Sequence, residues 1–413
     1  MAAILDGLTY NSAFYDLLNG ALSQAGYQNA QSFFRDEFTE DTFPSTKWQD
    51  LFPASDESND DGVVYQFYGV NTVPVMATYT SSSAEGHLIS NEGFKVATQS
   101  MPQARISYRY NEKSFLDGQR LMRQSGIPEY MKIYSSFLKD TTDLIAGVHS
   151  LRSYTALQVE STGKLLTDST NNNGGIIGLE FDFTKNISNF SGNVQKAGGF
   201  GIGDSEYTAQ GKAHDWTNVN AYPIGDLRDM VWVYENYKHQ DASTAVIRMS
   251  KHDANIFYNH PTTKAEVQLW RSGYVVNPSQ IGNVHVDESI TNEYLKSINL
   301  PTIEVEKWYG AVSAINPATK KMEKKTIQGF ANGKVLLRPA GICGNYQWQA
   351  PTTIFSTSIN PMYLSDGGRI GVQQETRTMS KEMYFCAESK GIAVPNNVDL
   401  WLYLDIKTSQ ETT

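Results

Sequence analysis

The feature that most constrains this 413-residue chain is one long helical pattern, which begins at Pro128 and continues to Gly163. Proline is favoured at the first position of a helix, because its missing N–H would have no partner there. Apolar residues recur at helical spacing in two adjacent stripes. The stripes are Met131, Tyr134, Leu138, Ile145 and Val148, and Ile133, Phe137, Leu144, Leu151 and Tyr154. About 35 residues at 1.5 Å each give a rod of roughly 50 Å without coiled-coil heptads, so the pattern predicts a solitary spine helix.

The two stretches before this helix do not form a core by themselves. Residues 1–62 carry scattered aromatic side chains in a polar background and close with an acidic turn at 53–62, a pattern typical of an arm. Residues 63–112 hold β-branched and aromatic runs on both sides of a Ser-rich tip at 81–86, which predicts a long β-hairpin with return strands. Because an isolated two-stranded ribbon is marginal in water, we expect the hairpin to lie on a neighbouring molecule.

The chain after the helix mixes helices and strands. A helix is expected around 227–234 and a strand at 245–249, and Ser250 and Asp253 form a capping box that opens another helix. Further strands are expected at 302–314, 322–328, 334–338 and 400–406. The sequence therefore predicts an α+β fold, and it contains no internal repeats.

The charge pattern argues against tight binding to nucleic acid. The formal net charge is −10, whereas displacing phosphate counterions requires clustered Lys and Arg. The densest basic run, 320–325, is short, contains a Glu and falls in an expected hairpin turn. Only 19% of residues are charged, so much of the surface is polar and uncharged, as is common where subunits pack together.

The compartment is indicated by cysteine usage and by the N-terminus. Two cysteines, Cys343 and Cys386, exclude a disulfide scaffold. A single bridge between them stays open, but nothing local indicates it, and they are interpreted as reduced thiols. The first seven residues lack the basic start and the apolar run of a signal peptide, and no stretch approaches the roughly 18 apolar residues of a membrane span. We expect a protein that folds in the cytoplasm and has no membrane partner.

Motifs of known active sites are missing from the sequence. It lacks His-Glu-x-x-His, Cys-x-x-Cys, Gly-x-Ser-x-Gly and the phosphate-binding P-loop. His149 is interpreted as a packed or interfacial histidine, because no partner recurs at metal-ligand spacing. Asp56, Asp60 and Asp61 lack the spacing of a calcium loop. We therefore expect no catalytic, cofactor-binding or metal-binding residues and no enzyme activity.

A resemblance to a known family rests on the order of these elements and on short motifs. The motifs are Arg152, Ala156-Leu157 and Thr162-Gly163-Lys164 at the helix end, then Leu300-Pro301, Trp308-Tyr309, and Gly333 to Leu337 with Pro339 and Gly341. An arm, a long hairpin, a spine helix, an inserted α/β region and closing strands resemble the major capsid proteins of tailed bacteriophages. That family has the Hong Kong 97-like capsid fold, and this chain looks closest to its lambda-type branch.

The resemblance implies a division of the chain into the parts of a phage capsid protein. In sequence order they are an N-terminal arm (1–62), an extended β-hairpin loop (63–112), a peripheral domain with the spine helix 128–163 (113–214), an axial domain (215–335) and returning strands of the peripheral domain (336–413). Some family members cross-link a loop Lys to a neighbour's Asn. The tip here contains no Lys and Lys95 lies far from it, so we expect non-covalent contacts or a separate cement protein.

The implied function is a structural one. The chain would assemble with itself as hexamers and pentamers into an icosahedral shell, made in the host cytoplasm and ending in the virion. Expected partners are portal, cement or decoration proteins and a scaffold encoded separately; packaged DNA would be held only loosely. Candidate subunit-interface residues are Phe14, Phe33, Phe34, Glu85, His87, Arg105, Arg109, Arg120 and Arg123.

Two other functions stay open on the sequence. An encapsulin-type nanocompartment shell shares the fold. A β-rich carbohydrate-binding protein is the alternative from another class, and it is favoured by the abundance of Tyr, Trp, Asn and Gly. Particle size in solution separates a shell protein from a binding module.

Overall fold

The structure is a computed structural model, and it divides the chain into two compact units. Unit 1 comprises Met1–Val64, Gln99–Ser153 and Tyr346–Ala393, and unit 2 comprises Tyr65–Thr98, Tyr154–Asn345 and Val394–Thr413. The residues that the structure describes are Ser23, Gly26, 47–68, 95–111, 129–168, 171–172, 177–185, 187, 190–196, 215–273, 284–315, 322–351, 360–377 and 382–406.

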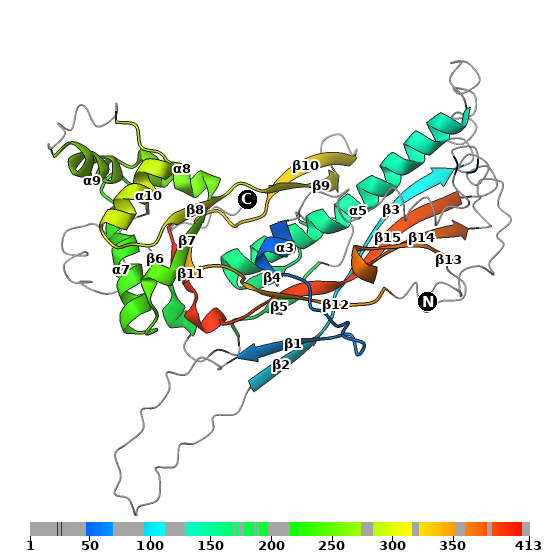
Figure 1. The fold of residues 1–413 in the computed structure, drawn as a ribbon, viewed down its shortest axis with the longest axis horizontal. Helices are drawn as coiled ribbons and strands as arrows, with labels where there is room; N and C mark the ends of the chain where they lie inside the picture. The colour runs from blue at the N-terminus through cyan, green and yellow to red at the C-terminus, as the bar shows by residue number, and fades with distance from the viewer. Residues whose placement is uncertain are drawn as a thin grey trace, which may run out of the picture. The chain divides into compact units, whose positions relative to one another are not determined.

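The longest element is the helix α5 (Glu129–Thr162), which has 34 residues (Figure 1). It was expected over 128–163, and the observed ends differ by one residue each. Gly163 ends the helix in a left-handed conformation (φ 68°), and its N–H donates to the Val159 carbonyl at 2.9 Å. A Cβ at this position would lie 2.5 Å from Thr184 Cγ2, so both the backbone angle and the close packing require glycine.

Unit 1 is built on an antiparallel sheet next to the first part of α5. Its strands are β12 (Gly344–Gln349), β15 (Glu382–Pro395), β14 (Ile370–Arg377), β13 (Asn360–Ser365) and β3 (Gln103–Asn111). β15 pairs with β14 and, through nine residues, with β3. Ile106 of β3 reaches α5, because a Cβ on Gly147 would lie 2.9 Å from its Cδ1. The return strand expected at 105–110 is therefore a strand of this sheet, and its partner is β15.

The N-terminal part of unit 1 packs on its own chain. The helix α3 (Lys47–Leu51) buries Trp48 completely, and Phe52 after it is also fully buried. The chain then runs beside β12, where the Ser55 N–H donates to the Tyr346 carbonyl at 3.0 Å. The arm was expected over 1–62, and its continuously described part, residues 47–62, packs on unit 1.

Unit 2 contains a five-stranded sheet with helices on one face (Figure 1). The strand order is β6 (Val194–Lys196), β16 (Leu402–Asp405), β11 (Lys334–Pro339), β7 (Ala245–Ser250) and β8 (Ile303–Glu306). The helices are α7 (Pro223–Asn236), α8 (Lys251–Asn259), α9 (Pro261–Ser272) and α10 (Glu288–Ser297). Strand residues Ile247, Met249, Val335 and Leu337 form one apolar core with the buried faces of these helices.

The remaining strands form two-stranded pairs. They are β1 (Val63–Tyr68) with β2 (Lys95–Ser100), β4 (Lys164–Leu166) with β5 (Glu180–Asp182), and β9 (Tyr309–Ile315) with β10 (Met322–Gln328). Short 3-10 helices are η3 (Phe190–Asn193), η4 (Ala242–Thr244), η7 (Asp366–Gly368) and η8 (Val398–Leu400). The β1–β2 pair is the base of the expected hairpin, and residues 69–94 lie outside the described residues. Together the elements give a mixed α+β chain.

Candidate functional site

Buried charged side chains mark the places where unusual chemistry or unusual packing occurs. Within the described ranges, no group of three or more His, Cys, Asp or Glu residues is arranged to hold a metal ion. None of the described helices has the length and apolarity needed to cross a membrane. Two clusters centred on buried arginines stand out, one in each unit.

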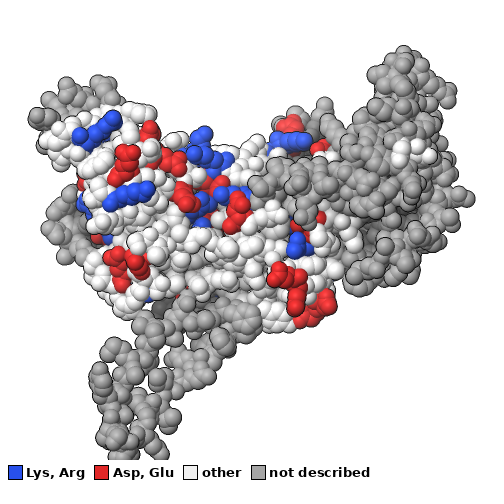
Figure 2. Space-filling view, in the orientation of Figure 1, with Lys and Arg blue, Asp and Glu red and all other residues white. Residues whose placement is uncertain are grey.

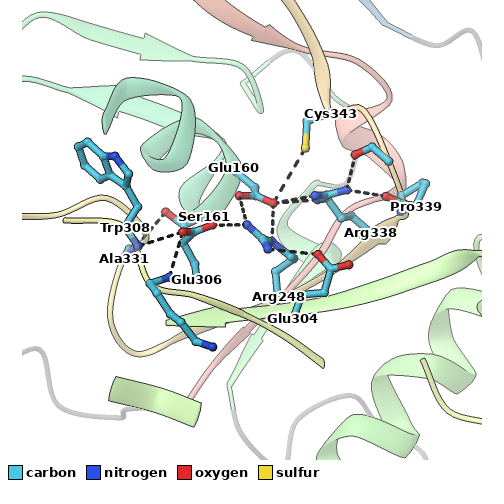
Figure 3. A network of polar contacts seen from close by, with 12 residues as sticks. Glu160, Ser161, Arg248, Glu304, Glu306, Trp308, Ala331, Arg338, Pro339 and Cys343 are labelled. Carbon is cyan, nitrogen blue, oxygen red and sulfur yellow. Dashed lines mark hydrogen bonds and ion pairs between the residues drawn. The ribbon is translucent and has the colours of Figure 1, made fainter. Parts of the chain in front are cut away.

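The cluster in unit 2 is centred on Glu160, in the last turn of α5 (Figure 3). This side chain is fully buried. The Arg248 guanidinium of β7 donates through Nε to Glu160 Oε1 at 2.9 Å and through Nη2 to Oε2 at 3.3 Å. Arg338 of β11 donates through its Nε to Glu160 Oε1, also at 2.9 Å. One carboxylate is thus shared by two buried guanidinium groups.

The same arginines bind further acceptors. Arg248 contacts Glu306 Oε2 at 2.7 Å and Glu304 Oε2 at 3.2 Å. The Glu306 side chain is buried, whereas that of Glu304 is 57% exposed. Arg338 donates through Nη1 to the carbonyls of Pro339 and Gly341, at 2.8 and 3.0 Å. The network therefore ties the end of α5 to the three strands β7, β8 and β11.

The electrostatics of this cluster favour the charged forms. Burial alone would raise the pKa of Glu160, but the charges and hydrogen bonds of Arg248 and Arg338 lower it below the ordinary value. The pKa of Arg248 is raised, since Glu160 and Glu306 outweigh its own burial. The stabilisation from Glu160 is complete above the ordinary carboxylate pKa and is lost as pH falls through the lowered one. At neutral pH the cluster is a set of fixed, mutually paired charges, suited to holding elements together.

The cluster in unit 1 is centred on Arg152, one helix turn after His149 on α5. Arg152 contacts Asp366 Oδ2 at 2.5 Å, the Ser389 hydroxyl at 2.7 Å and the Arg369 carbonyl at 3.2 Å. Its guanidinium also stacks on two aromatic rings, with centroids 5.0 Å away for Trp48 and 4.8 Å away for Tyr346. Charge pairing and cation–π contact together fix the side chain.

His149 completes this second cluster. Trp48 Nε1–H donates to His149 Nδ1 at 3.2 Å, and the two rings are nearly parallel, with an interplanar angle of 14°. Because Nδ1 accepts this bond, the imidazole is neutral and carries its proton on Nε2. Burial, assisted by the charge of Arg152, lowers the pKa of His149 to about 4. The sequence interpretation of a packed or interfacial histidine agrees with this burial.

The structure brings together few of the candidate interface residues. Arg105 is exposed on β3, and its Nη2 lies 3.4 Å from Cys386 Sγ on β15. Arg109 lies on the same strand in register with Tyr384. The other seven candidates lie outside the described residues: Phe14, Phe33, Phe34, Glu85, His87, Arg120 and Arg123. Their interface role stays a prediction.

Sequence reasoning missed the unit 2 network. The sequence feature that could have indicated it is a charged residue inside an apolar strand. Arg248 is such a residue in Ala245–Ser250, and Arg338 is another in Lys334–Pro339.

On the face drawn in Figure 2, the described Lys and Arg side chains are interspersed with Asp and Glu, and they form no continuous basic surface there.

Comparison with known proteins found matches among solved structures. No family model and no curated protein matches the sequence. A putative capsid protein of an E. coli CFT073 prophage is similar in structure, with 11% identity over 95% of this chain and 98% of that chain and a TM-score of 0.43. The chain is similar to phage capsid proteins.

Two further solved structures illustrate the range of the similarity. The capsid of Myoviridae phage XM1 has 10% identity over 89% of this chain and 93% of that chain, with a TM-score of 0.36. A virus-like particle from Pyrococcus furiosus has 10% identity over 95% of this chain and all of that chain (100%), with a TM-score of 0.33.

Proposed function

We propose that this chain is the major capsid protein of a tailed bacteriophage. It would be a structural protein, without enzyme activity, that assembles as hexamers and pentamers into an icosahedral shell around the phage genome. The observation that carries the proposal is the 34-residue α5, preceded by a β1–β2 hairpin base and followed by an inserted α/β region and closing strands. This is the order of elements from which the family resemblance of the sequence was drawn.

The internal organisation supports a shell protein. In the proposed shell protein the long helix needs a firm attachment, and the Glu160 network provides one in unit 2 through four buried charged side chains. We propose the division into arm 1–62, extended loop 63–112, peripheral domain 113–214, axial domain 215–335 and returning strands 336–413. Within it, residues 47–62 of the arm anchor the N-terminal part to the same chain.

The two-stranded pairs support contacts between copies. In the β9–β10 hairpin, Ala311, Ser313 and the residues 323–326 are exposed. A two-stranded ribbon gains stability when another surface covers it, so neighbouring copies are the expected partners. Portal, scaffold and cement proteins complete the proposed set, with the shell assembled in the host cytoplasm and retained in the virion.

The proposal is tested by the size of the purified protein. Expressed alone or with its scaffold, the chain is expected to elute as hexamers or megadalton particles and to show shells by negative-stain microscopy. A monomer or small oligomer at high concentration would contradict the proposal and favour a binding protein. Shells that enclose a cargo enzyme encoded beside the gene, with no portal gene present, would indicate a nanocompartment.

A variant pair examines the candidate interface on β3. Arg109→Glu reverses a charge on this strand of unit 1, and we expect it to reduce particle yield strongly. Arg109→Lys keeps the charge and is the matched control, with yield near that of the unmodified chain. Normal shells from Arg109→Glu would refute the interface role of this residue without affecting the proposal for the whole chain.

A further inference from the structure

The contact between Trp48 and His149 joins two segments that are 101 residues apart in the sequence. Trp48 belongs to the short α3, and His149 to α5. Both side chains are buried, with exposed fractions of 0% and 6%. The hydrogen bond from the indole N–H to Nδ1 therefore lies in a site from which water is largely excluded, where a lost acceptor is costly.

Behind Trp48, the segment that begins at α3 is held on unit 1 by a row of further hydrogen bonds. The Ser55 N–H donates to the Tyr346 carbonyl at 3.0 Å, and the Asn59 N–H donates to the Trp348 carbonyl at 2.7 Å. The Tyr346 N–H donates back to the Pro53 carbonyl at 2.9 Å. Side chains add to this, since Trp348 Nε1–H donates to the Ser55 carbonyl at 2.8 Å and the Ala350 N–H donates to Ser58 Oγ at 3.2 Å. Residues 47–62 thus form a latch segment, with Trp48 as its buried anchor and a row of hydrogen bonds to residues 346–350 behind it.

We propose that His149 and Trp48 form a pH-controlled latch, which holds residues 47–62 on unit 1 at neutral pH and releases them when His149 is protonated. Protonation places a hydrogen on Nδ1, so the atom that accepts the Trp48 N–H becomes a donor directed at another donor. It also places a second positive charge beside Arg152, one turn away on the same helix. Both effects act against the packed position of Trp48.

Burial of His149, and then the charged groups around it, set the direction of this response. On α5 the facing charge is Arg152, and on η7 it is Asp366, which is paired with Arg152 at 2.5 Å. Asp366 also contacts Arg369 at 3.3 Å, and β12 contributes the neutral ring of Tyr346. α3 contributes the neutral indole of Trp48. Asp366 favours the charged histidine and acts in the opposite direction, but burial and Arg152 outweigh it, so the pKa of His149 stays lowered.

The size of the response follows from proton linkage. The pKa of His149 is about 4 in the latched state, against 6.5 for an ordinary histidine. The latched state binds fewer protons, so the latch weakens as pH falls from about 6.5 towards 4. With these two values the equilibrium constant for opening rises about 20-fold between pH 7 and pH 5, and about 100-fold by pH 4.

Hydrogen exchange of the full chain, followed by mass spectrometry and corrected for intrinsic rates, measures this opening in peptides that cover 47–62. The interval from pH 7 to pH 5 is diagnostic, because most carboxylates stay charged there. Protection of the unmodified chain is expected to fall about 20-fold across it. In His149→Gln the side-chain oxygen can still accept from Trp48 but does not titrate, so the fall is expected to be less than about threefold.

His252→Gln is the matched control, since His252 is exposed on α8 in unit 2. It is expected to show the same fall as the unmodified chain. An equal fall in His149→Gln, or no fall in the unmodified chain, would overturn the latch. If His149→Gln does not fold, Trp48→Phe is used in its place. Loss of the N–H donor should lower the protection of 47–62 at pH 7 and reduce the further fall in protection between pH 7 and pH 5. An unreduced fall would overturn the latch. The outcome is independent of shell assembly, because the contact lies within one chain.

Discussion

Glu160→Gln is the substitution that most directly examines the unit 2 network. It keeps the shape of the side chain and removes the charge that Arg248 and Arg338 share. Arg248 retains Glu306 at 2.7 Å and Glu304 at 3.2 Å. Among the described residues, the Arg338 guanidinium retains the carbonyls of Pro339 and Gly341 and has no second carboxylate. The variant therefore leaves one buried cation without a counter-charge.

The expected cost is set by that buried cation. Removing one partner of a buried ion pair typically costs about 3–5 kcal/mol, because the remaining charge stays desolvated. The side chains of Arg338 and Glu160 are 3% and 0% exposed, so the full range applies. For a unit of this size the loss lowers Tm by on the order of 10 °C. Glu304→Gln is the control; its carboxylate is 57% exposed and should cost about 1 kcal/mol or less.

Scanning calorimetry of the two variants beside the unmodified chain measures the difference. The transition of unit 2 is followed separately by hydrogen exchange of peptides from β7 and β11, because a chain with two units does not unfold in one step. A double variant, Glu160→Met with Arg338→Met, removes both charges and should be more stable than Glu160→Gln. Equal stability of Glu160→Gln and Glu304→Gln would refute the reasoning.

Two further substitutions probe packing within single units. Arg152→Lys keeps the charge but loses the planar fork that reaches Asp366, Ser389 and the Arg369 carbonyl, and we expect about 2–3 kcal/mol lower stability of unit 1 by thermal unfolding. A stability unchanged within 0.5 kcal/mol, roughly the effect of an ordinary surface substitution, would count against this. Gly344→Ala places a Cβ 2.0 Å from the Val394 carbonyl oxygen, so about 3 kcal/mol or more should be lost and soluble yield should drop. Gly192→Ala, which meets nothing within 4 Å, is the control; equal yields and Tm values would contradict the clash.

Elements with strong local signals were predicted well from the sequence. The expected helix 128–163 is α5, and the strand expected at 245–249 is β7 (Ala245–Ser250). The N-cap of the expected capping box is also present: Ser250 Oγ accepts from the Asp253 N–H at 3.1 Å, while the Asp253 carboxylate accepts from Ser250 Oγ at 2.8 Å. In each case the residues that define the element are close in sequence, so periodicity and capping chemistry suffice.

Predictions that depended on distant partners were less accurate. A single strand was expected over 302–314, but the chain turns after Glu306 and gives β8 and β9. The turn arises because Glu306 Oε1 accepts the N–H groups of Lys307 and Trp308, at 2.9 and 3.0 Å. Similarly, nothing near β3 in the sequence indicates that its partner is β15, more than 270 residues later. Such pairings are decided by packing across the whole chain.

The buried network was not predictable for the same reason, and its position indicates what it does. In the sheet register, Arg248 lies opposite Leu336 on β11 and Glu304 on β8, and Arg338 lies two residues further along β11. All these side chains therefore share one face of the sheet, towards Glu160. The neighbouring residues Ile247, Met249, Val335 and Leu337 point to the other face, into the apolar core of the helices.

A slip of β11 by one residue would reverse this arrangement, because side chains alternate between the two faces of a strand. Arg338 would enter the apolar core without a counter-charge, at a cost of several kcal/mol, while Leu337 would face Glu160. An apolar pair in place of Glu160 and Arg338 would penalise the slip far less, since Val, Leu and Met suit either face. The network therefore contributes more to the selection of one register, and so to a defined attachment of α5, than to the stability of unit 2.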